Sequence, residues 1–316
     1  MKPKILAIVG PTAVGKSDLS LQLAQKYHGE IISGDALQIY RQLDIGTAKV
    51  DQATQQLVPH HLIDIRNVDQ NYSAFQFQQD AQRLIAEITA RGHLPIIAGG
   101  TGFYLRGLLE NLALGGAVAG TGTSQADQIA LREKWQVKLD QVGAAALWQE
   151  LAAIDPAAAA KIPQNNPRRV MRALTVITET GQLFSQQVQA QPQYDAFVLG
   201  LNCPRPLLYQ RINLRVTQMM NAGLLAEAKW LASQVPASAQ AAKGIGYREF
   251  YPYFAGERTL AEVAEQIQID SRHYAKRQLT YFRHQLPTRW YDILTQADTD
   301  LPRISSDLAD WLKKVN

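Results

Sequence analysis

The segment IVGPTAVGKS, residues 8–17, constrains the fold more than any other part of this chain. It fits the pattern G-x-x-x-x-G-K-[ST], in which a strand leads into a glycine-bounded loop and the loop opens a helix. The backbone N–H groups of such a loop face the phosphate oxygens of a ligand. An apolar run precedes the motif at Lys4–Val9, and Leu19 and Leu23 follow it at helical spacing. The segment therefore predicts a diphosphate site. Its expected members are Gly10, Thr12, Ala13, Val14, Gly15, Lys16 and Ser17.

Strand-like segments alternate with helical ones along much of the chain. Strands are expected at Glu30–Ser33, His61–Ile65, Leu94–Ala98, Ala196–Asn202 and Arg289–Ile293. A helix is expected from an N-cap at Ser73 to Arg91, because apolar residues recur there at helical spacing. Strands that alternate with helices form a mostly parallel sheet with helices on its faces. We therefore predict an α/β fold, with a P-loop NTPase-like parallel sheet flanked by helices.

The alternation stops at a Gly-rich segment, residues 115–123, whose composition is typical of a linker. From Ile129 to about Gln187 the chain is rich in Ala, Leu and Gln and predicts successive helices. The strand pattern resumes at Asp195. The sequence thus predicts an inserted all-helical domain at residues 115–194, between a first core segment at 1–114 and a second at 195–316.

The composition is that of a folded cytoplasmic enzyme. Charged residues make up 19% and apolar residues 46% of the chain, which excludes a largely disordered protein. The single cysteine, Cys203, has no partner for an internal disulfide and is expected to be buried. No apolar run approaches the ~20 residues that a membrane-spanning helix needs. Residues 201–290 carry twelve Lys and Arg against six Asp and Glu, which fits either an anionic polymer or an ordinary solvated basic face.

The acidic residues near the loop bear on whether a nucleotide is hydrolysed there. P-loop NTPases hold Mg²⁺ with an acid that follows a buried strand. The best strand, Leu94–Ala98, ends instead in Gly99-Gly100-Thr101, which disfavours an ordinary ATPase. The adjacent His60 and His61 point to opposite faces of a strand, so we expect structural roles for them rather than metal binding.

Asp35 is the next acid after the second expected strand, Glu30–Ser33. The carboxyl ends of neighbouring parallel strands meet at the ligand crevice, so Asp35 is expected beside the diphosphate. A carboxylate so close to a diphosphate is unfavourable unless a cation or a proton-transfer task separates the charges. A general base that acts on an incoming acceptor and a plain turn aspartate both fit this position.

Several longer segments together resemble the tRNA dimethylallyltransferases, also called tRNA isopentenyltransferases. They are GPTAVGKS, IISGDALQIYRQLDIGTAK, PHHLIDI, GGTGFYLRGLL, NPRRVMRAL, GIGYRE and SRHYAKRQLTYFR, and they run from residue 10 to residue 283. The resemblance implies transfer of a dimethylallyl group from dimethylallyl diphosphate to N6 of adenine 37 in tRNA, with pyrophosphate as the leaving group. The chain departs from the family at Ala36, where the family usually has serine.

The resemblance also implies catalytic roles for Asp35, Thr101 and Lys16. Asp35 would accept the N6 proton, and Thr101 would lie between the two substrates. Lys16 would stabilise the leaving pyrophosphate, together with Mg²⁺ held partly by the Ser17 hydroxyl. Arg215 would reach the diphosphate.

Residues expected to bind tRNA fall into four groups. An adenine that leaves its stack would meet Asp35, Ala36, Leu37, Gln38 and Thr101, and the amide of Gln38 offers both a donor and an acceptor. Arg272 and Lys276 share a helical stripe with Arg283 that suits phosphates. The insertion contributes Arg168, Arg169 and Arg172, and the GIGYRE region contributes Lys243, Gly246, Tyr247 and Arg248.

The sequence also leaves alternative functions open. A P-loop small-molecule kinase explains the loop and Asp35 but not the insertion and the basic stripe. Prenyl transfer to a free adenine nucleotide keeps the chemistry with a smaller acceptor. A non-catalytic RNA-binding module leaves the intact Lys16, Ser17 and Asp35 without a purpose. The expected partners are the anticodon stem-loop of tRNA and dimethylallyl diphosphate, with no membrane, and the protein is expected to be a monomer.

Overall fold

The computed structural model describes residues 2–114, 125–186 and 191–314. Contacts within the chain divide it into two compact units, one made of Met1–Glu110 with Pro192–Asn316 and the other of Asn111–Gln191. The larger unit contains two hydrophobic clusters and the smaller unit contains a third. The Gly-rich segment that the sequence marks as a linker lies outside the described residues.

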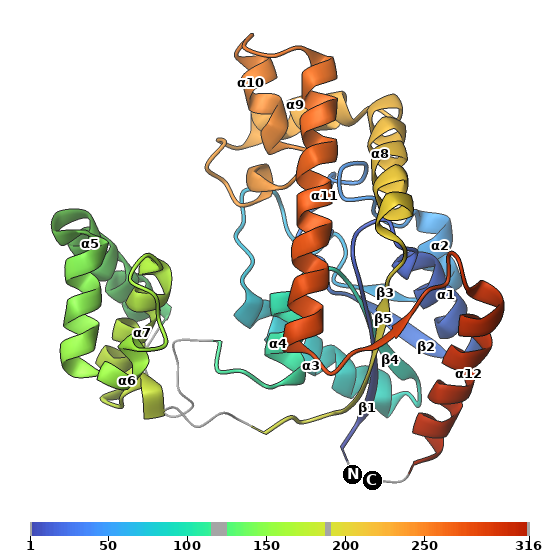
Figure 1. Cartoon of the computed structure of the whole chain (residues 1–316), viewed down its shortest axis with the longest axis horizontal. Helices are drawn as coiled ribbons and strands as arrows, with labels where there is room; N and C mark the ends of the chain where they lie inside the picture. Colours follow the sequence, from blue (N-terminus) through green and yellow to red (C-terminus); the bar gives the residue numbers. More distant parts are fainter. Residues whose placement is uncertain (1, 115–124, 187–190, 315–316) are drawn as a thin grey trace. The chain divides into compact units, whose positions relative to one another are not determined.

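The larger unit is built on a six-stranded parallel sheet with the strand order β3-β2-β4-β1-β5-β6 (Figure 1). The strands are β1 (Lys4–Val9), β2 (Gly29–Ser33), β3 (His60–His61), β4 (Leu94–Ala98), β5 (Asp195–Leu201) and β6 (Arg289–Tyr291). A parallel strand covered on both faces has a continuous apolar sequence. The central strand β1 shows this, because every residue from Ile5 to Val9 is fully buried. The predicted parallel α/β fold is therefore confirmed.

Helices cover both faces of this sheet. Alternate residues of β1 point to opposite faces, so Ile5 and Val9 join one hydrophobic cluster while Leu6 and Ile8 join the other. The first cluster includes residues of α3, α4, α9 and α11, and the second includes residues of α1, α8 and α12. The helices are α1 (Lys16–Lys26), α2 (Gln52–Leu57), α3 (Ala74–Ala90), α4 (Gly102–Leu109), α8 (Arg205–Asn221), α9 (Leu224–Gln234), α10 (Tyr251–Phe254), α11 (Leu260–Gln285) and α12 (Ala297–Lys313), with short 3₁₀ segments at Ala241–Lys243 and Arg248–Phe250.

The strand predicted at His61–Ile65 is wrong in its extent, because β3 contains only His60 and His61. Leu62 and Asp64 have left-handed φ angles of 60° and 54°. A strand cannot continue through that conformation. The Asp64 carboxylate instead forms an ion pair with Lys49 at 2.6 Å. Tertiary contacts therefore overrode an apolar pattern that favoured a strand.

The only regular secondary structure in the described residues of the smaller unit is helical. It contains α5 (Gln125–Ile154), α6 (Pro156–Ala159), α7 (Pro167–Thr180) and a 3₁₀ segment at Phe184–Gln186. Its core is formed by Trp135, Leu147, Leu151, Val170 and Leu174, together with smaller neighbours. In the larger unit Cys203 is buried, as expected. Among the described helices of both units, none has the length and apolar character to cross a membrane.

The buried Glu30 side chain organises the edge of the sheet where β2, β3 and β4 begin. Both carboxylate oxygens accept hydrogen bonds from Arg91, at 2.9 and 2.7 Å. Ring nitrogens of His61 and His93 lie 2.7 Å from the same carboxylate, so His61 has a structural contact. Burial by itself raises the pKa of Glu30, but the hydrogen bonds from Arg91, His61 and His93 outweigh it and lower the pKa to about 2.

We expect Glu30→Gln to remove an acid-sensitive part of the stability. The folded-state pKa lies below the ordinary value of 4.5, so this contribution is present above that value and is lost as the pH falls toward 2. The shift corresponds to about 3 kcal/mol in the free energy of unfolding. Urea unfolding between about pH 6 and pH 3 should show that the free energy of unfolding falls more steeply with decreasing pH in the parent than in the variant. Parallel curves would mean that Glu30 does not carry the effect.

Candidate active site

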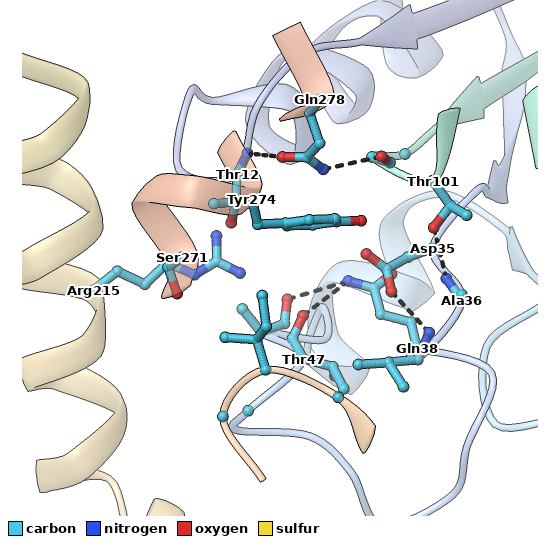
Figure 2. Close-up of a pocket in the computed structure, with 18 of the residues that line it drawn as sticks. Thr12, Asp35, Ala36, Gln38, Thr47, Thr101, Arg215, Ser271, Tyr274 and Gln278 are labelled. Carbon is cyan, nitrogen blue, oxygen red and sulfur yellow. Dashed lines mark hydrogen bonds between the residues drawn. The ribbon is translucent and has the colours of Figure 1, made fainter. Parts of the chain in front are cut away.

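A cavity of about 430 Å³ lies in the larger unit, where β1, β2 and β4 end (Figure 2). In open α/β sheets, ligands bind at the carboxyl ends of the strands. The loops after these strands form part of the wall, and α8 and α11 form much of the rest. Residues that line it include Thr12, Lys16, Ser17, Asp35, Ala36, Leu37, Gln38, Thr101, Arg215, Lys243, Gly246 and Arg248, all expected from the sequence.

The loop between β1 and α1 depends on glycine at two positions. Gly10 has a φ of 147°, and a Cβ on it would lie 2.6 Å from the carbonyl oxygen of Leu201. Gly15 has a φ of 98° and caps the N-terminus of α1. Neither backbone conformation suits a residue with a side chain. Because the first N–H groups of a helix have no partner within it, the start of α1 at Lys16 and Ser17 presents donors to an anion.

Lys16 sits in a cationic part of the cavity. Its Nζ donates to the carbonyl oxygens of Gly10 at 3.0 Å and Pro11 at 2.7 Å. Burial, followed by the charge of Arg215, lowers the pKa of Lys16 to about 7, while Asp35 acts in the opposite direction. Burial also lowers the pKa of Arg215. The charged form of each side chain is therefore destabilised. An anionic ligand between them would stabilise both charges.

Asp35 and Thr101 follow neighbouring strands and contact the same short loop. The Asp35 Oδ1 accepts the N–H of Leu37 at 2.9 Å, which holds the carboxylate in a tight turn. The Thr101 Oγ1 accepts the N–H of Ala36 at 3.1 Å, and its hydroxyl can still donate. Because Ala36 contributes its backbone to this contact, the contact does not need the serine side chain that the family usually has.

The amide of Gln38 has a fixed orientation. Its Nε2 donates to the carbonyl oxygen of Thr47 at 3.2 Å, and its Oε1 accepts from the Ser33 hydroxyl at 2.8 Å. These contacts distinguish the oxygen from the nitrogen of the amide. The oxygen keeps a second lone pair for a donor in the cavity. Figure 2 shows Gln38 beside Asp35 on the same side of the cavity.

Helix α11 supplies cavity residues that the sequence analysis missed. Ile267, Ser271, Tyr274 and Gln278 recur every three or four residues along α11 and line the cavity. The hydroxyl end of the Tyr274 ring points toward Asp35 and Thr101 (Figure 2). Burial raises the pKa of Tyr274 to about 12, so the hydroxyl keeps its proton at neutral pH. The spacing was visible in the sequence, but nothing in it showed which face of the helix meets the sheet.

Gln278 connects two of the loops. Its Oε1 accepts the N–H of Thr12 at 3.0 Å, and its Nε2 donates to the carbonyl oxygen of Gly100 at 3.0 Å. The N–H of Thr12, expected to face a phosphate, is therefore bonded within the protein. A phosphate would meet the N–H groups further along the loop and at the start of α1.

The GIGYRE region contributes in two ways. Lys243 and Arg248 are exposed and line the cavity. Tyr247 is only 1% exposed, and its hydroxyl donates to Glu227 at 2.7 Å. The side chain of Tyr247 therefore packs behind the cavity wall, which is a different position from the tRNA contact that the sequence suggested.

The other predicted tRNA contacts lie outside the cavity lining. On α11, Lys276 is exposed, while Arg272 is half-buried and donates to the Asn213 side chain at 2.7 Å. Arg168 and Arg169 are exposed at the start of α7 in the smaller unit, and Arg172 is half-buried one turn later.

The strand–loop–helix motif, the parallel sheet and the cavity at its strand ends define a P-loop protein of the α/β class. The family model described as IPP transferase matches residues 38–285. The chain is 55% identical over 313 residues to the tRNA dimethylallyltransferase of Latilactobacillus sakei, with 99% of each chain covered. The chain belongs to the tRNA dimethylallyltransferase family, which confirms the resemblance and makes the protein an enzyme of the transferase class.

Solved structures agree with this assignment. The tRNA isopentenylpyrophosphate transferase of Bacillus halodurans is 40% identical, with a TM-score of 0.74 and coverage of 99% of this chain and 97% of that one. A eukaryotic dimethylallyltransferase described as acting on tRNA is 28% identical, with a TM-score of 0.81 and coverage of 97% of this chain and 79% of that one.

Proposed function

We propose that the protein transfers a dimethylallyl group from dimethylallyl diphosphate to N6 of adenine 37 in the anticodon loop of tRNA and releases pyrophosphate. The observation that carries this proposal is one cavity whose lining brings the cations Lys16 and Arg215 together with Asp35 and Thr101. The cations suit a leaving diphosphate, and the carboxylate suits an acceptor that must lose a proton. Membership of the family supports the same reaction.

The diphosphate end of the donor would lie against the start of α1. There Lys16 and Arg215 would stabilise the charge that develops on the leaving group. The apolar part of the donor would pack against apolar side chains of α8, because Ile212, Val216 and Met219 also line the cavity. These residues recur at three- and four-residue spacing, so they share one face of the helix. A site with a cationic end and an apolar wall suits an allylic diphosphate better than a nucleoside triphosphate.

The acceptor would enter beside Asp35, Thr101 and Gln38. N6 of adenine would attack the allylic carbon as the bond between that carbon and the diphosphate oxygen breaks. The bonding electron pair leaves with pyrophosphate, and the N6 proton passes to Asp35. Gln38 would accept from the second N6 hydrogen through its remaining lone pair.

The cavity also fits a magnesium ion. The Ser17 hydroxyl and the Asp35 carboxylate both line it, and Mg²⁺ prefers oxygen ligands shared between the protein and substrate phosphates. We propose that Ser17 provides one of these ligands. When bound, the ion neutralises part of the charge on the diphosphate.

The tRNA would contact more than the cavity. We propose that the predicted insertion, residues 115–194 between core segments 1–114 and 195–316, is a tRNA-contacting domain that uses Arg168, Arg169 and Arg172 on phosphates. Lys243 and Arg248 would contact the nucleic acid near the cavity. We also propose that the enzyme acts as a monomer.

The direct test offers labelled dimethylallyl diphosphate with tRNA, AMP or ATP in separate reactions. We expect the label on tRNA only, and no phosphate release from ATP, because β4 is followed by Gly99 rather than by an acid. Labelling of AMP instead of tRNA would favour the free-nucleotide transferase. Steady release of phosphate from ATP would favour a kinase or an NTPase.

Lys276→Glu should weaken tRNA binding in a salt-dependent way. The side chain is exposed on α11, whereas Arg272 is also tied to Asn213, so Lys276 gives the cleaner test. Loss of one phosphate contact lowers the slope of log affinity against log salt by about one. Filter binding at several salt concentrations measures it, with Arg83→Glu on α3 as a control of equal charge change. Identical slopes for Lys276→Glu and the parent would mean that Lys276 does not contact a tRNA phosphate and that this face of α11 is simply exposed to solvent.

A further inference from the structure

The carboxylate of Glu227 in α9 holds a turn of backbone from another part of the chain. It accepts the N–H groups of Asp44, Ile45 and Gly46, each at 2.8 Å. The Tyr247 hydroxyl donates to the same carboxylate at 2.7 Å. Successive backbone N–H groups that converge on one anion form a nest, and hydrogen bonds to a charged acceptor are stronger than neutral ones. Glu227 is thus a clamp on the turn at residues 44–48.

The clamped turn reaches the cavity. Gly46, Thr47 and Ala48 line it. The carbonyl oxygens of Thr47 and Ala48 accept from the Gln38 Nε2 at 3.2 and 3.5 Å. These contacts, with the Ser33 hydroxyl on the other side of the amide, decide which way Gln38 faces. A chain of hydrogen bonds therefore runs from Glu227 through the turn to Gln38.

Close packing holds the turn from the same side. A Cβ on Gly46 would lie 2.6 Å from the ring and hydroxyl of Tyr247, so the turn runs directly against this buried side chain. Lys49 secures the far end, where its Nζ donates to the carbonyl oxygen of Tyr40 at 2.8 Å. Its ion pairs with Asp44 and Asp64 are each 2.6 Å long.

We propose that Glu227 is a positioning residue for the acceptor base: its carboxylate fixes the 44–48 turn, and the turn fixes the amide of Gln38. The inference rests on the proposed function, because Gln38 has an acceptor to position only if an adenine enters there. Glu227 acts on the acceptor side of the cavity and not on the diphosphate side, which is formed by α1 and α8. Loss of the Glu227 carboxylate should therefore impair the reaction with tRNA and leave the binding of dimethylallyl diphosphate nearly unchanged.

Hydrogen exchange tests the clamp without reference to activity. In Glu227→Gln one carboxylate oxygen becomes an NH₂ group, which cannot accept the N–H groups that now converge there. Exchange of the amides at residues 44–46 should become about 10 to 100 times faster, the range expected for a lost charge-assisted hydrogen bond. Glu262→Gln is the matched control, because Glu262 also accepts a backbone N–H, from Thr259 at 2.7 Å, in an exposed helix cap. Unchanged exchange in Glu227→Gln overturns the clamp.

Kinetics test the positioning role. Glu227→Gln should lower kcat/KM for tRNA about 10- to 100-fold and leave the KM for dimethylallyl diphosphate within about twofold. In a Gln38→Ala background the same change should cost less than about threefold, because the residue through which Glu227 acts is already gone. Equal damage toward both substrates, or full additivity with Gln38→Ala, means that Glu227 only supports the fold.

A milder variant covers the case in which Glu227→Gln is poorly folded. Tyr247→Phe removes one hydrogen bond to the carboxylate and keeps the ring under Gly46, so it should shift tRNA kinetics in the same direction by a smaller factor. An increase in the KM for dimethylallyl diphosphate instead would count against the proposal. Failure of the parent to prenylate tRNA refutes the proposed function and the positioning role with it, whereas the exchange result alone decides the clamp.

Discussion

Asp35→Asn is expected to lower the single-turnover rate of dimethylallyl transfer to tRNA by about 10²–10⁴, the usual contribution of a general base. Asparagine keeps the size of the side chain and can still accept the N–H of Leu37 that now bonds to the carboxylate at 2.9 Å. It loses the charge and the ability to take the N6 proton. The loss should therefore fall on the chemical step. Single-turnover labelling at saturating tRNA and dimethylallyl diphosphate measures it.

Binding should survive in Asp35→Asn, because the contacts proposed for the diphosphate and for tRNA lie mostly on other residues. Separate equilibrium affinities for tRNA and for dimethylallyl diphosphate check this. Asp51→Asn is a matched control: Asp51 is an exposed helix cap that accepts the N–H of Thr54, and asparagine caps equally well. If Asp35→Asn kept more than about a tenth of the parent rate, Asp35 would not be the base, and the role would pass to Thr101 or to water.

Lys16→Ala is expected to lower kcat/KM for dimethylallyl diphosphate by at least about 10²-fold, the cost of losing one preorganised contact to a developing oxyanion. Unlike Asp35→Asn, it should also raise the KM, because Lys16 would contact the diphosphate both before and during its departure. Steady-state kinetics with varied donor and saturating tRNA separate the two parameters. Lys26→Ala, at the other end of α1, is the control for loss of a lysine from the same helix.

The same lysine predicts a pH dependence of donor binding. Burial and Arg215 lower the pKa of Lys16 to about 7, and a bound diphosphate raises it again because the negative charge favours the ammonium form. The affinity for dimethylallyl diphosphate should then weaken by up to about tenfold per pH unit above pH 7. Equilibrium binding between about pH 7 and pH 9 tests this. The dependence should disappear in Lys16→Ala, and its persistence there would assign it to another group.

The parts of the candidate site that the sequence predicted are those next to a strand end. Lys16, Asp35 and Thr101 each follow a strand that its apolar run identifies, and parallel strands end at one edge of a sheet. Their meeting in one cavity follows from topology alone. Arg215 was expected from the family resemblance, because a helical arginine far along the chain carries no local sign of where it points.

Long-range packing determined the features that could not be predicted from the sequence. The face of α11 that carries Tyr274 and Gln278 is no more distinctive in sequence than the face that carries Lys276. Only the docking of α11 beside the loops brings Gln278 to Thr12 and to Gly100. The strand expected at His61–Ile65 failed for a related reason, since the backbone is left-handed at Leu62 and Asp64 and the Asp64 carboxylate pairs with Lys49 from another segment.

The sequence by itself determined the P-loop, the alternation of strands and helices, and the family, because each depends on residues that are neighbours in the chain or on motifs read in order. Tertiary structure alone decided how the polar groups of those motifs are used. The N–H of Thr12 is bonded to Gln278, Tyr247 lies behind the wall, and Glu227 holds the 44–48 turn through contacts that span about 180 residues of chain. Buried polar groups must find partners, and which partners they find depends on how the helices pack over the sheet.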